Sequence, residues 1–326
     1  MSATPPGRTV ALSVHAHYAC RHSGACCSAG WAIPVEPSRR PVIGHDVLLP
    51  MADGGCPLHD REAHRCRVHH EHGEALLPVS CFHFPRRARL DDRGTVVSLS
   101  HFCPTAADLL VNPSGPLEVI EAPPAFPAAR EYEGLDGRNA WPPLIKTDLL
   151  FDLPGYERWE RHIVARCAAS GESAVDVLQQ LAVEAEDLRG WTPDDGPLEA
   201  LIDAWTARAD SRDDRRQAWW RYQPLRTLDA YERVLACVPE GLAPPDLTDE
   251  DRERWAQSAG RPLAPAVYRH FIAAKAFGTW AAFEAFGVRT LIAELAVADL
   301  VLNVEAVRAL RAGRRGPVAT PVLDAG

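Results

Sequence analysis

Apolar residues recur at helical spacing through the second half of the chain. The first such stripe returns every three or four residues, at Tyr156, Trp159, Ile163 and Cys167. Further stripes run through residues 174–188, 198–205, 219–235, 265–285 and 287–311. Ser173 and Asp176 stand three residues apart at the start of the second stripe, as in a capping box. The pattern predicts an α-helical bundle over residues 151–312, followed by a disordered tail at 313–326.

The first part of the chain has no long helical period and many turn residues. One β-hairpin is expected, with strands at 86–90 and 95–100 and a turn that contains Gly94. A short helix is expected after Cys103, because Pro104 suits the first helical position. We therefore predict an irregular module over residues 1–111 and a connector rich in Pro and Gly over 112–150. The expected fold class is mainly α.

Composition narrows the class of protein further. The chain has 326 residues, of which 46% are hydrophobic, and no apolar run approaches the about 18–20 residues of a membrane span. No basic patch followed by an apolar stretch opens the chain, so we expect no secretory signal and a cytoplasmic protein. The net charge of −9 gives no reason to expect binding to nucleic acid or to a membrane.

Cysteine and histidine are concentrated near the N-terminus. Seven of the nine cysteines lie within residues 1–103, and eleven of the thirteen histidines lie within residues 1–101. The seven clustered cysteines are Cys20, Cys26, Cys27, Cys56, Cys66, Cys81 and Cys103. Thiolates are soft ligands for Zn²⁺ and for iron–sulfur clusters. All seven are therefore candidate metal ligands, and the predicted module is organised by a metal centre.

The spacing of these cysteines is too irregular for a zinc finger, so the ligands would have to converge through tertiary folding. Adjacent Cys26 and Cys27 are expected to point to opposite faces of an extended chain, which favours a polynuclear cluster or two neighbouring sites. One alternative is that the clustered cysteines form disulfides, which would need an oxidising compartment. Burial as small hydrophobic residues is the other alternative, and it is favoured for Cys167 and Cys237 on the helical stripes.

Two histidines and one basic run complete the candidate chemistry. His22 lies inside the Cys20–Cys27 loop and His101 lies two residues before Cys103, which makes them the best histidine candidates for ligands. The run 86–89 holds three arginines directly after a candidate ligand. They are expected to offset the charge of the cluster or to bind an anionic group, unless they form a solvated hairpin face.

The ordered cysteine series resembles the YkgJ-type cysteine-cluster family, whose domain is thought to chelate zinc or iron. The resemblance covers residues 15–110 and rests on Cys56-Pro57-Leu58, Cys66-Arg67-Val68, Cys81-Phe82-His83-Phe84-Pro85 and Cys103-Pro104. More narrowly, the chain is similar to the branch that contains flagellin lysine N-methylases. That likeness rests on Cys26-Cys27-x3-Trp31, Gly73-Glu74-x2-Leu77, Pro85-Arg86-Arg87 and Ser98-Leu99-Ser100.

The resemblance implies a methyltransferase that acts on lysine in a protein or peptide, with S-adenosylmethionine as methyl donor. Family members have a further cysteine before the Cys-Cys pair, where this chain has His22 nearby. The sequence itself shows neither a radical C-x3-C-x2-C motif nor a glycine-rich loop after a clear strand, and no catalytic residue is assigned.

The functional hypothesis is therefore a cysteine-cluster metalloprotein that holds a [4Fe-4S]-type iron–sulfur centre rather than zinc and methylates protein lysine. The first alternative is a non-enzymatic interaction module stabilised by zinc. The second is an iron–sulfur protein for electron transfer or redox sensing.

Overall fold

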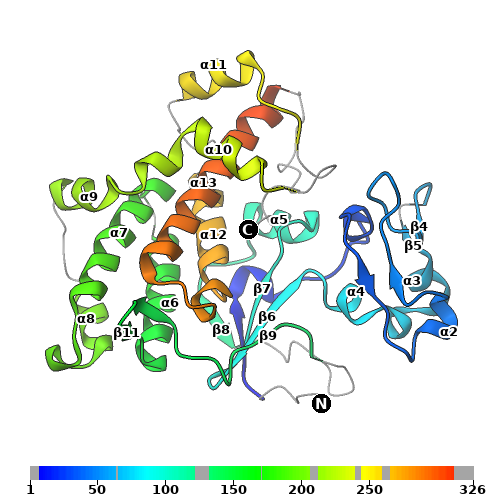
Figure 1. Ribbon diagram of the computed structural model, residues 1–326, viewed down its shortest axis with the longest axis horizontal. Coiled ribbons are helices and arrows are strands. Elements are labelled where there is room, and N and C mark those ends of the chain that lie inside the picture. Colours follow the sequence, from blue (N-terminus) through cyan, green and yellow to red (C-terminus); the bar gives the residue numbers. More distant parts are fainter. Residues whose placement is uncertain are drawn as a thin grey trace.

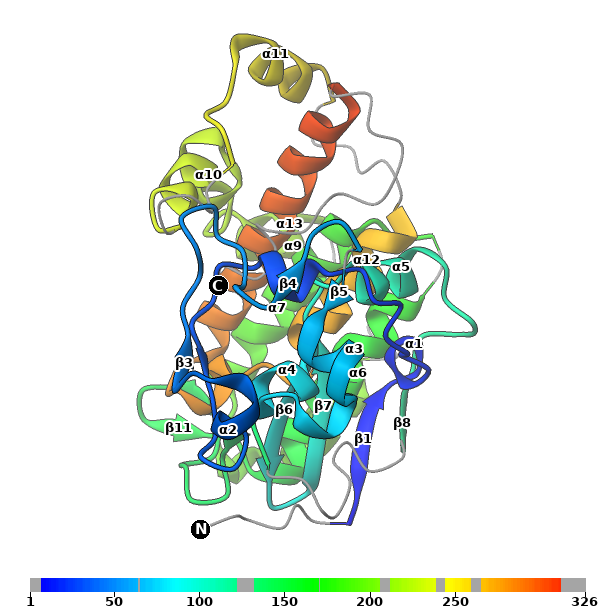
Figure 2. The ribbon, with the colours of Figure 1, turned by 90° about the vertical axis from the view of Figure 1, so that its right-hand side faces the viewer.

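The computed structural model describes residues 7–63, 65–121, 132–169, 171–205, 212–238, 244–258 and 265–311. A β-sheet stands in the middle of the molecule (Figure 1). The large helices of the second half cover one side of it, and a small lobe of short elements lies on the other side (Figures 1 and 2). This arrangement separates the cysteine-rich segment from the helical bundle.

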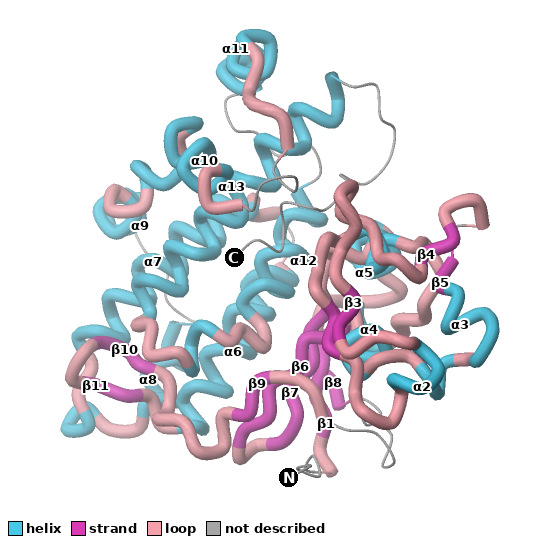
Figure 3. The backbone as a smooth tube through the Cα atoms, turned by 45° about the vertical axis from the view of Figure 1, so that its right-hand side comes forward, coloured by secondary structure: helices cyan, strands magenta, loops and turns pink. Residues whose placement is uncertain are grey.

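The central sheet has five strands in the order β8-β1-β7-β6-β9. Its strands are β1 (Thr9–Leu12), β6 (Arg86–Asp91), β7 (Gly94–Leu99), β8 (Val119–Glu121) and β9 (Leu135–Asp136). The hairpin β6–β7 is antiparallel, with Arg89 opposite Val96, whereas β1 pairs with β7 in parallel. The sheet therefore collects strands from the first 12 residues, from the predicted hairpin and from the predicted connector (Figure 3).

The small lobe is built from short elements between β1 and β6. Its helices and 3-10 turns are α1 (Ser13–Ala16), η1 (Ala25–Ser28), α2 (Arg40–Ile43), α3 (Arg67–His72), η2 (Glu74–Leu76) and α4 (Val79–His83). Its two-residue strands are β2 (Ile33–Pro34), β3 (Val47–Leu48), β4 (His59–Asp60) and β5 (Arg65–Cys66). A small core of its own holds the lobe together, made of Val35, Ile43, Leu48, Val68 and Leu77.

The remaining helices follow the sheet. They are α5 (Pro104–Val111), α6 (Leu153–Ala168), α7 (Ala174–Gly190), α8 (Leu198–Ala204), α9 (Arg212–Trp219), α10 (Leu228–Leu235), α11 (Asp249–Ser258), α12 (Pro265–Ala276) and α13 (Val288–Arg311). The 3-10 turns η3 (Pro193–Asp195), η5 (Gln223–Arg226) and η6 (Ala281–Phe283) connect them, and a small hairpin joins β10 (Leu144–Lys146) to β11 (Leu149–Leu150).

The mainly α fold class is confirmed, as are the hairpin and the helix after Cys103. The Ser173 hydroxyl accepts a hydrogen bond from the Asp176 amide at 3.2 Å, and the Asp176 carboxylate accepts one from the Ser173 amide at 2.9 Å, so the predicted capping box is present. The stripe at 219–235 does not form one helix. It divides into the end of α9, the 3-10 turn η5 and the helix α10. Pro224 interrupts the hydrogen-bond ladder there.

The predicted connector does more than link two parts, since it supplies β8 and β9 to the central sheet. The largest hydrophobic core also joins Leu12 and Val96 of the sheet to the helices. Cys167 is fully buried in this core, as predicted. Cys237 is exposed, so its expected core role is wrong, because α10 ends at Leu235 and Cys237 lies in the turn after it. The predicted tail at 313–326 lies outside the described residues.

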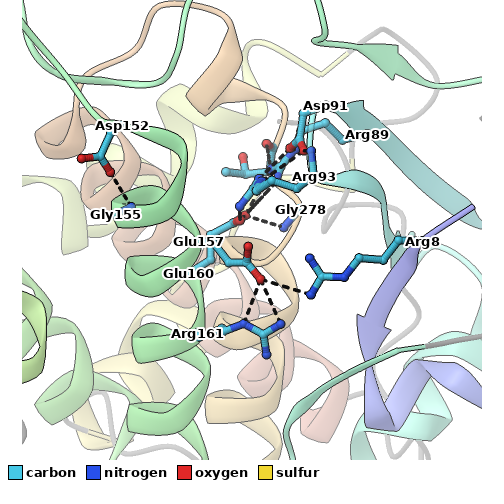
Figure 4. A network of polar contacts seen from close by, with 11 residues as sticks. Arg8, Arg89, Asp91, Arg93, Asp152, Gly155, Glu157, Glu160, Arg161 and Gly278 are labelled. Atoms are coloured by element: carbon cyan, nitrogen blue, oxygen red, sulfur yellow. Dashed lines mark hydrogen bonds and ion pairs between the residues drawn. The ribbon is translucent and has the colours of Figure 1, made fainter. Parts of the chain in front are cut away.

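A buried ionic cluster fastens the sheet to α6 (Figure 4). The guanidinium of Arg89 donates to both carboxylate oxygens of Glu160, at 3.1 and 3.2 Å, and its Nε donates to Asp91 at 3.3 Å. Arg93 donates to Glu160 at 3.0 Å, and the Gly278 amide donates at 3.3 Å. Burial alone would raise the pKa of Glu160, but the charges of Arg89 and Arg93 hold it below its usual range.

Across the described ranges, no helix combines the length and the apolar character that a membrane crossing requires.

Candidate functional site

All seven N-terminal cysteines line one pocket in the small lobe. The pocket has a volume of about 330 Å³. Its cysteines come from six separate stretches of chain: the segment after α1, η1, the loop before β4, β5, α4 and the residue before α5. The structure therefore brings together around one pocket all seven candidate ligands, namely Cys20, Cys26, Cys27, Cys56, Cys66, Cys81 and Cys103.

Cys27 lines this pocket and is buried. Its carbonyl accepts a hydrogen bond of 2.7 Å from the amide of Cys56, which ties η1 to the loop before β4. The expectation that Cys26 and Cys27 point to opposite faces is wrong. The segment is the 3-10 turn η1 rather than an extended strand, and both side chains line the pocket and contact each other.

The thiols of the pocket differ strongly in acidity. The Cys27 thiol hydrogen-bonds to Cys26 and to Cys66, which raises the pKa of Cys27 and lowers the pKa of Cys26. The same contact lowers the pKa of Cys66 to about 6, with help from the amides of α3. Cys66 is therefore a thiolate at neutral pH. Burial raises the pKa of Cys56 and of Cys81, so both remain thiols.

Tyr18, Cys20 and Cys103 form a second group of neighbouring side chains in the pocket. The Tyr18 hydroxyl lies 3.6 Å from the Cys103 sulfur, and Cys20 lies close enough to affect Tyr18. Burial, the Cys103 contact and the Cys20 contact all raise the pKa of Tyr18. The phenol therefore stays protonated at neutral pH.

The metal centre predicted for these residues is not found. In the described part of the chain, no group of three or more His, Cys, Asp or Glu side chains is arranged to hold a metal ion. A zinc or iron site needs its donor atoms aimed at one point, with Zn–S bonds of about 2.3 Å. Here the Cys27 thiol hydrogen-bonds to Cys26 and to Cys66. The assignments as metal-binding, iron–sulfur, [4Fe-4S] and zinc protein are therefore corrected.

The two candidate histidine ligands lie in different places. The His22 ring lines the pocket mouth, with its centroid 5.0 Å from that of His69. His101 is buried outside the pocket lining, where its Nε2 atom lies 3.2 Å from the Nε2 atom of His15. Burial lowers the pKa of His101 to about 3 and lowers the pKa of His15, so both rings are neutral.

This histidine pair predicts that the protein loses stability in mild acid. Unfolding returns His101 to a pKa of about 6.5, so protons bind the unfolded chain first as the pH falls below that value. The loss grows as the pH falls from about 6.5 toward 3, and at pH 5 we expect His101 to contribute about 2 kcal/mol of it. Urea unfolding of the protein and of His101→Gln at pH 7 and pH 5 measures this. An equally steep pH dependence in the variant would contradict the prediction.

The three arginines of the basic run take three different positions. Because successive residues of a strand point to opposite faces, Arg87 and Arg89 face the helices, where Arg87 lies 5.5 Å from the Trp280 ring. Arg86 faces the other way and lines the pocket, 5.6 Å from the centroid of the Tyr18 ring. The idea of one solvated hairpin face is therefore wrong.

An aromatic wall that the sequence interpretation did not single out completes the pocket. Trp31 lies 5.3 Å from Phe84 and 5.3 Å from Phe102, measured between ring centroids. Trp31 and Phe84 line the pocket, and 40% of Trp31 is exposed. The motif position of Trp31, four residues after Cys27, was the signal that could have identified it.

The pocket thus combines an aromatic wall, seven cysteines that include the Cys66 thiolate, and the guanidiniums of Arg65 and Arg86. Such a mixture suits a ligand that has a flat apolar part together with charged groups. Comparison with models of protein families, with curated proteins and with solved structures finds no match for this chain.

Proposed function

We propose that the thiol pocket is the active site of a methyltransferase that transfers a methyl group from S-adenosylmethionine to lysine in a protein. The supporting observation is that residues of separate sequence motifs lie around the same pocket. Residues from three of the four motifs of the methylase-like branch, namely Cys26, Cys27, Trp31, Glu74, Leu77 and Arg86, line one pocket of about 330 Å³ together with Cys103. Ligand pockets typically measure about 300–1,000 Å³.

The proposed reaction moves a methyl group from the sulfonium sulfur to the lone pair of a neutral lysine amine. The amine then loses a proton to water, and S-adenosylhomocysteine remains. The Cys66 thiolate places a negative charge in the pocket, where it favours the cationic sulfonium over neutral molecules. The exposed positions of Cys20, Cys26 and Trp31 leave the rim open to a side chain of another protein. We place this reaction in the cytoplasm, where thiols stay reduced.

The proposal is tested by measuring transfer of tritium from labelled S-adenosylmethionine to flagellin. The same flagellin, acetylated on its lysines, is the control acceptor. We expect label in the first protein and none in the second. Cys66→Ser should reduce the rate at least about tenfold, as expected for the loss of one charged contact in a half-buried site. Cys237→Ser, which changes an exposed thiol outside the pocket, should leave the rate unchanged. Absence of transfer to any lysine-bearing protein would contradict the proposal.

Redox sensing by the thiols themselves is the second candidate, favoured by the contact between Cys27 and Cys66. A peroxide would oxidise the Cys66 thiolate to a sulfenic acid and be reduced to water. The Cys27 thiol would then form a disulfide and release a second water. Peptide mass spectrometry after treatment with hydrogen peroxide tests this. A Cys27–Cys66 disulfide supports it, and oxidation spread over all seven cysteines contradicts it.

A further inference from the structure

Arg86 is a pocket cation without a carboxylate partner in the described part of the chain. Its guanidinium lies over the Tyr18 ring, at 5.6 Å from the centroid, and it makes no ion pair with any described residue. Arg65, the other arginine of the pocket, lies 3.7 Å from Asp60. The neighbouring Arg89 of the same strand is fully paired with Glu160. A half-buried guanidinium that lacks an anion within the fold is suited to an anion of a ligand.

The aromatic wall lies close to this cation. Tyr18 and Phe84 both pack against the small core of Leu99, Cys103 and Ala106, and Trp31 contacts Phe84. Arg86 lies over Tyr18, and Trp31 lies against Phe84. Both residues therefore contact a ring that packs on the same small core. The half-exposed indole of Trp31 and the guanidinium of Arg86, which has no ion-pair partner among the described residues, offer a stacking surface and a charge within one pocket.

We infer that Arg86 and Trp31 form a subsite for S-adenosylmethionine, in which Arg86 binds the carboxylate of the amino-acid end and Trp31 stacks on the adenine. The inference rests on the proposed function and names the residues that would hold its methyl donor. A guanidinium matches a carboxylate with two parallel hydrogen bonds, which a lysine at the same place does not provide.

Calorimetric titration of the full-length protein with three probes tests the subsite. S-adenosylhomocysteine carries both recognition groups, adenosine carries only the ring, and methionine carries only the carboxylate end. Arg86→Gln should weaken S-adenosylhomocysteine about 10- to 100-fold and leave adenosine unchanged, because only the charged contact is lost. Arg86→Lys should recover part of that loss. Trp31→Leu should weaken S-adenosylhomocysteine and adenosine alike and leave methionine unchanged.

Two variants of the same residue types serve as controls. Arg87→Gln changes the next arginine, which stacks on Trp280 on the opposite face of β6, and Trp141→Leu changes a tryptophan that is 81% exposed and outside the pocket lining. Both should bind all three probes as the unaltered protein does. Urea unfolding of each variant identifies any that fails to fold, and the conservative Arg86→Lys then provides the comparison.

The outcomes separate the inference from the proposed function. Binding of S-adenosylhomocysteine that depends on Arg86 supports the subsite, even if no lysine is methylated, in which case only the proposed function fails. Methyl transfer by a protein whose Arg86→Gln variant binds S-adenosylhomocysteine normally would overturn the subsite and leave the proposed function intact. Failure of the unaltered protein to bind S-adenosylhomocysteine would overturn the subsite as well.

Discussion

Arg89→Met should lower the free energy of unfolding by about 3–5 kcal/mol, because it leaves buried carboxylates without their main partner. Arg89 is fully buried and Glu160 is 4% exposed, so water cannot replace the lost hydrogen bonds. Asp91 loses a partner as well, although Arg93 remains beside both acids. Urea unfolding at pH 7, followed by circular dichroism, measures the change.

Arg158→Met is the matched control for this prediction. Arg158 pairs with Asp203 on the surface, where each side chain is 49% exposed. Exposed ion pairs contribute about 0–1 kcal/mol, so this variant should unfold almost as the unaltered protein does. Equal losses for the two arginines would show that the buried cluster does not fasten the sheet to α6 in the way described.

Trp159→Ala should cost about 3–5 kcal/mol of stability, because it empties a large volume in the main core. Trp159 lies on α6, is 3% exposed, and stacks on Phe151 with ring centroids 5.4 Å apart. Its loss removes packing between α6 and the segment that leads into it. The midpoint and the slope of urea unfolding give the change in stability.

Trp141→Ala removes the same side chain from a position that is 81% exposed. We expect a change within about 0.5 kcal/mol, as is usual for surface positions. If Trp159→Ala were equally mild, the core described around α6 would be incorrect.

Local sequence patterns accounted for much of the helical half. The stripe of Tyr156, Trp159 and Ile163 became the buried face of α6, because a helix has to bury an apolar stripe wherever its partners lie. The hairpin 86–99 and the capping box at Ser173 also follow from local geometry alone. Such features depend on neighbours a few residues apart, so the sequence contains them.

The sequence predicted the pocket only in part. The cysteine series identified which residues belong together, and all seven line one pocket. Their arrangement was not visible, because the 3-10 turn η1 brought Cys26 and Cys27 into contact at the same pocket. In the described part of the chain, no three or more potential ligands are arranged to hold a metal ion. The part played by Trp31 also depends on contacts with Phe84 and Phe102, which lie more than fifty residues away along the chain.

The amino-acid sequence by itself determined most of the helices, the hairpin and the set of cysteines that line the pocket, because periodicity, turn residues and motif order are local properties. Only the tertiary structure decided what each of these residues does. Arg86, Arg87 and Arg89 are close neighbours in the chain, yet one lines the pocket, one stacks on Trp280 and one is paired with Glu160. The physical reason is that charge and thiol chemistry depend on the groups brought alongside by distant segments, and a linear pattern does not specify those neighbours.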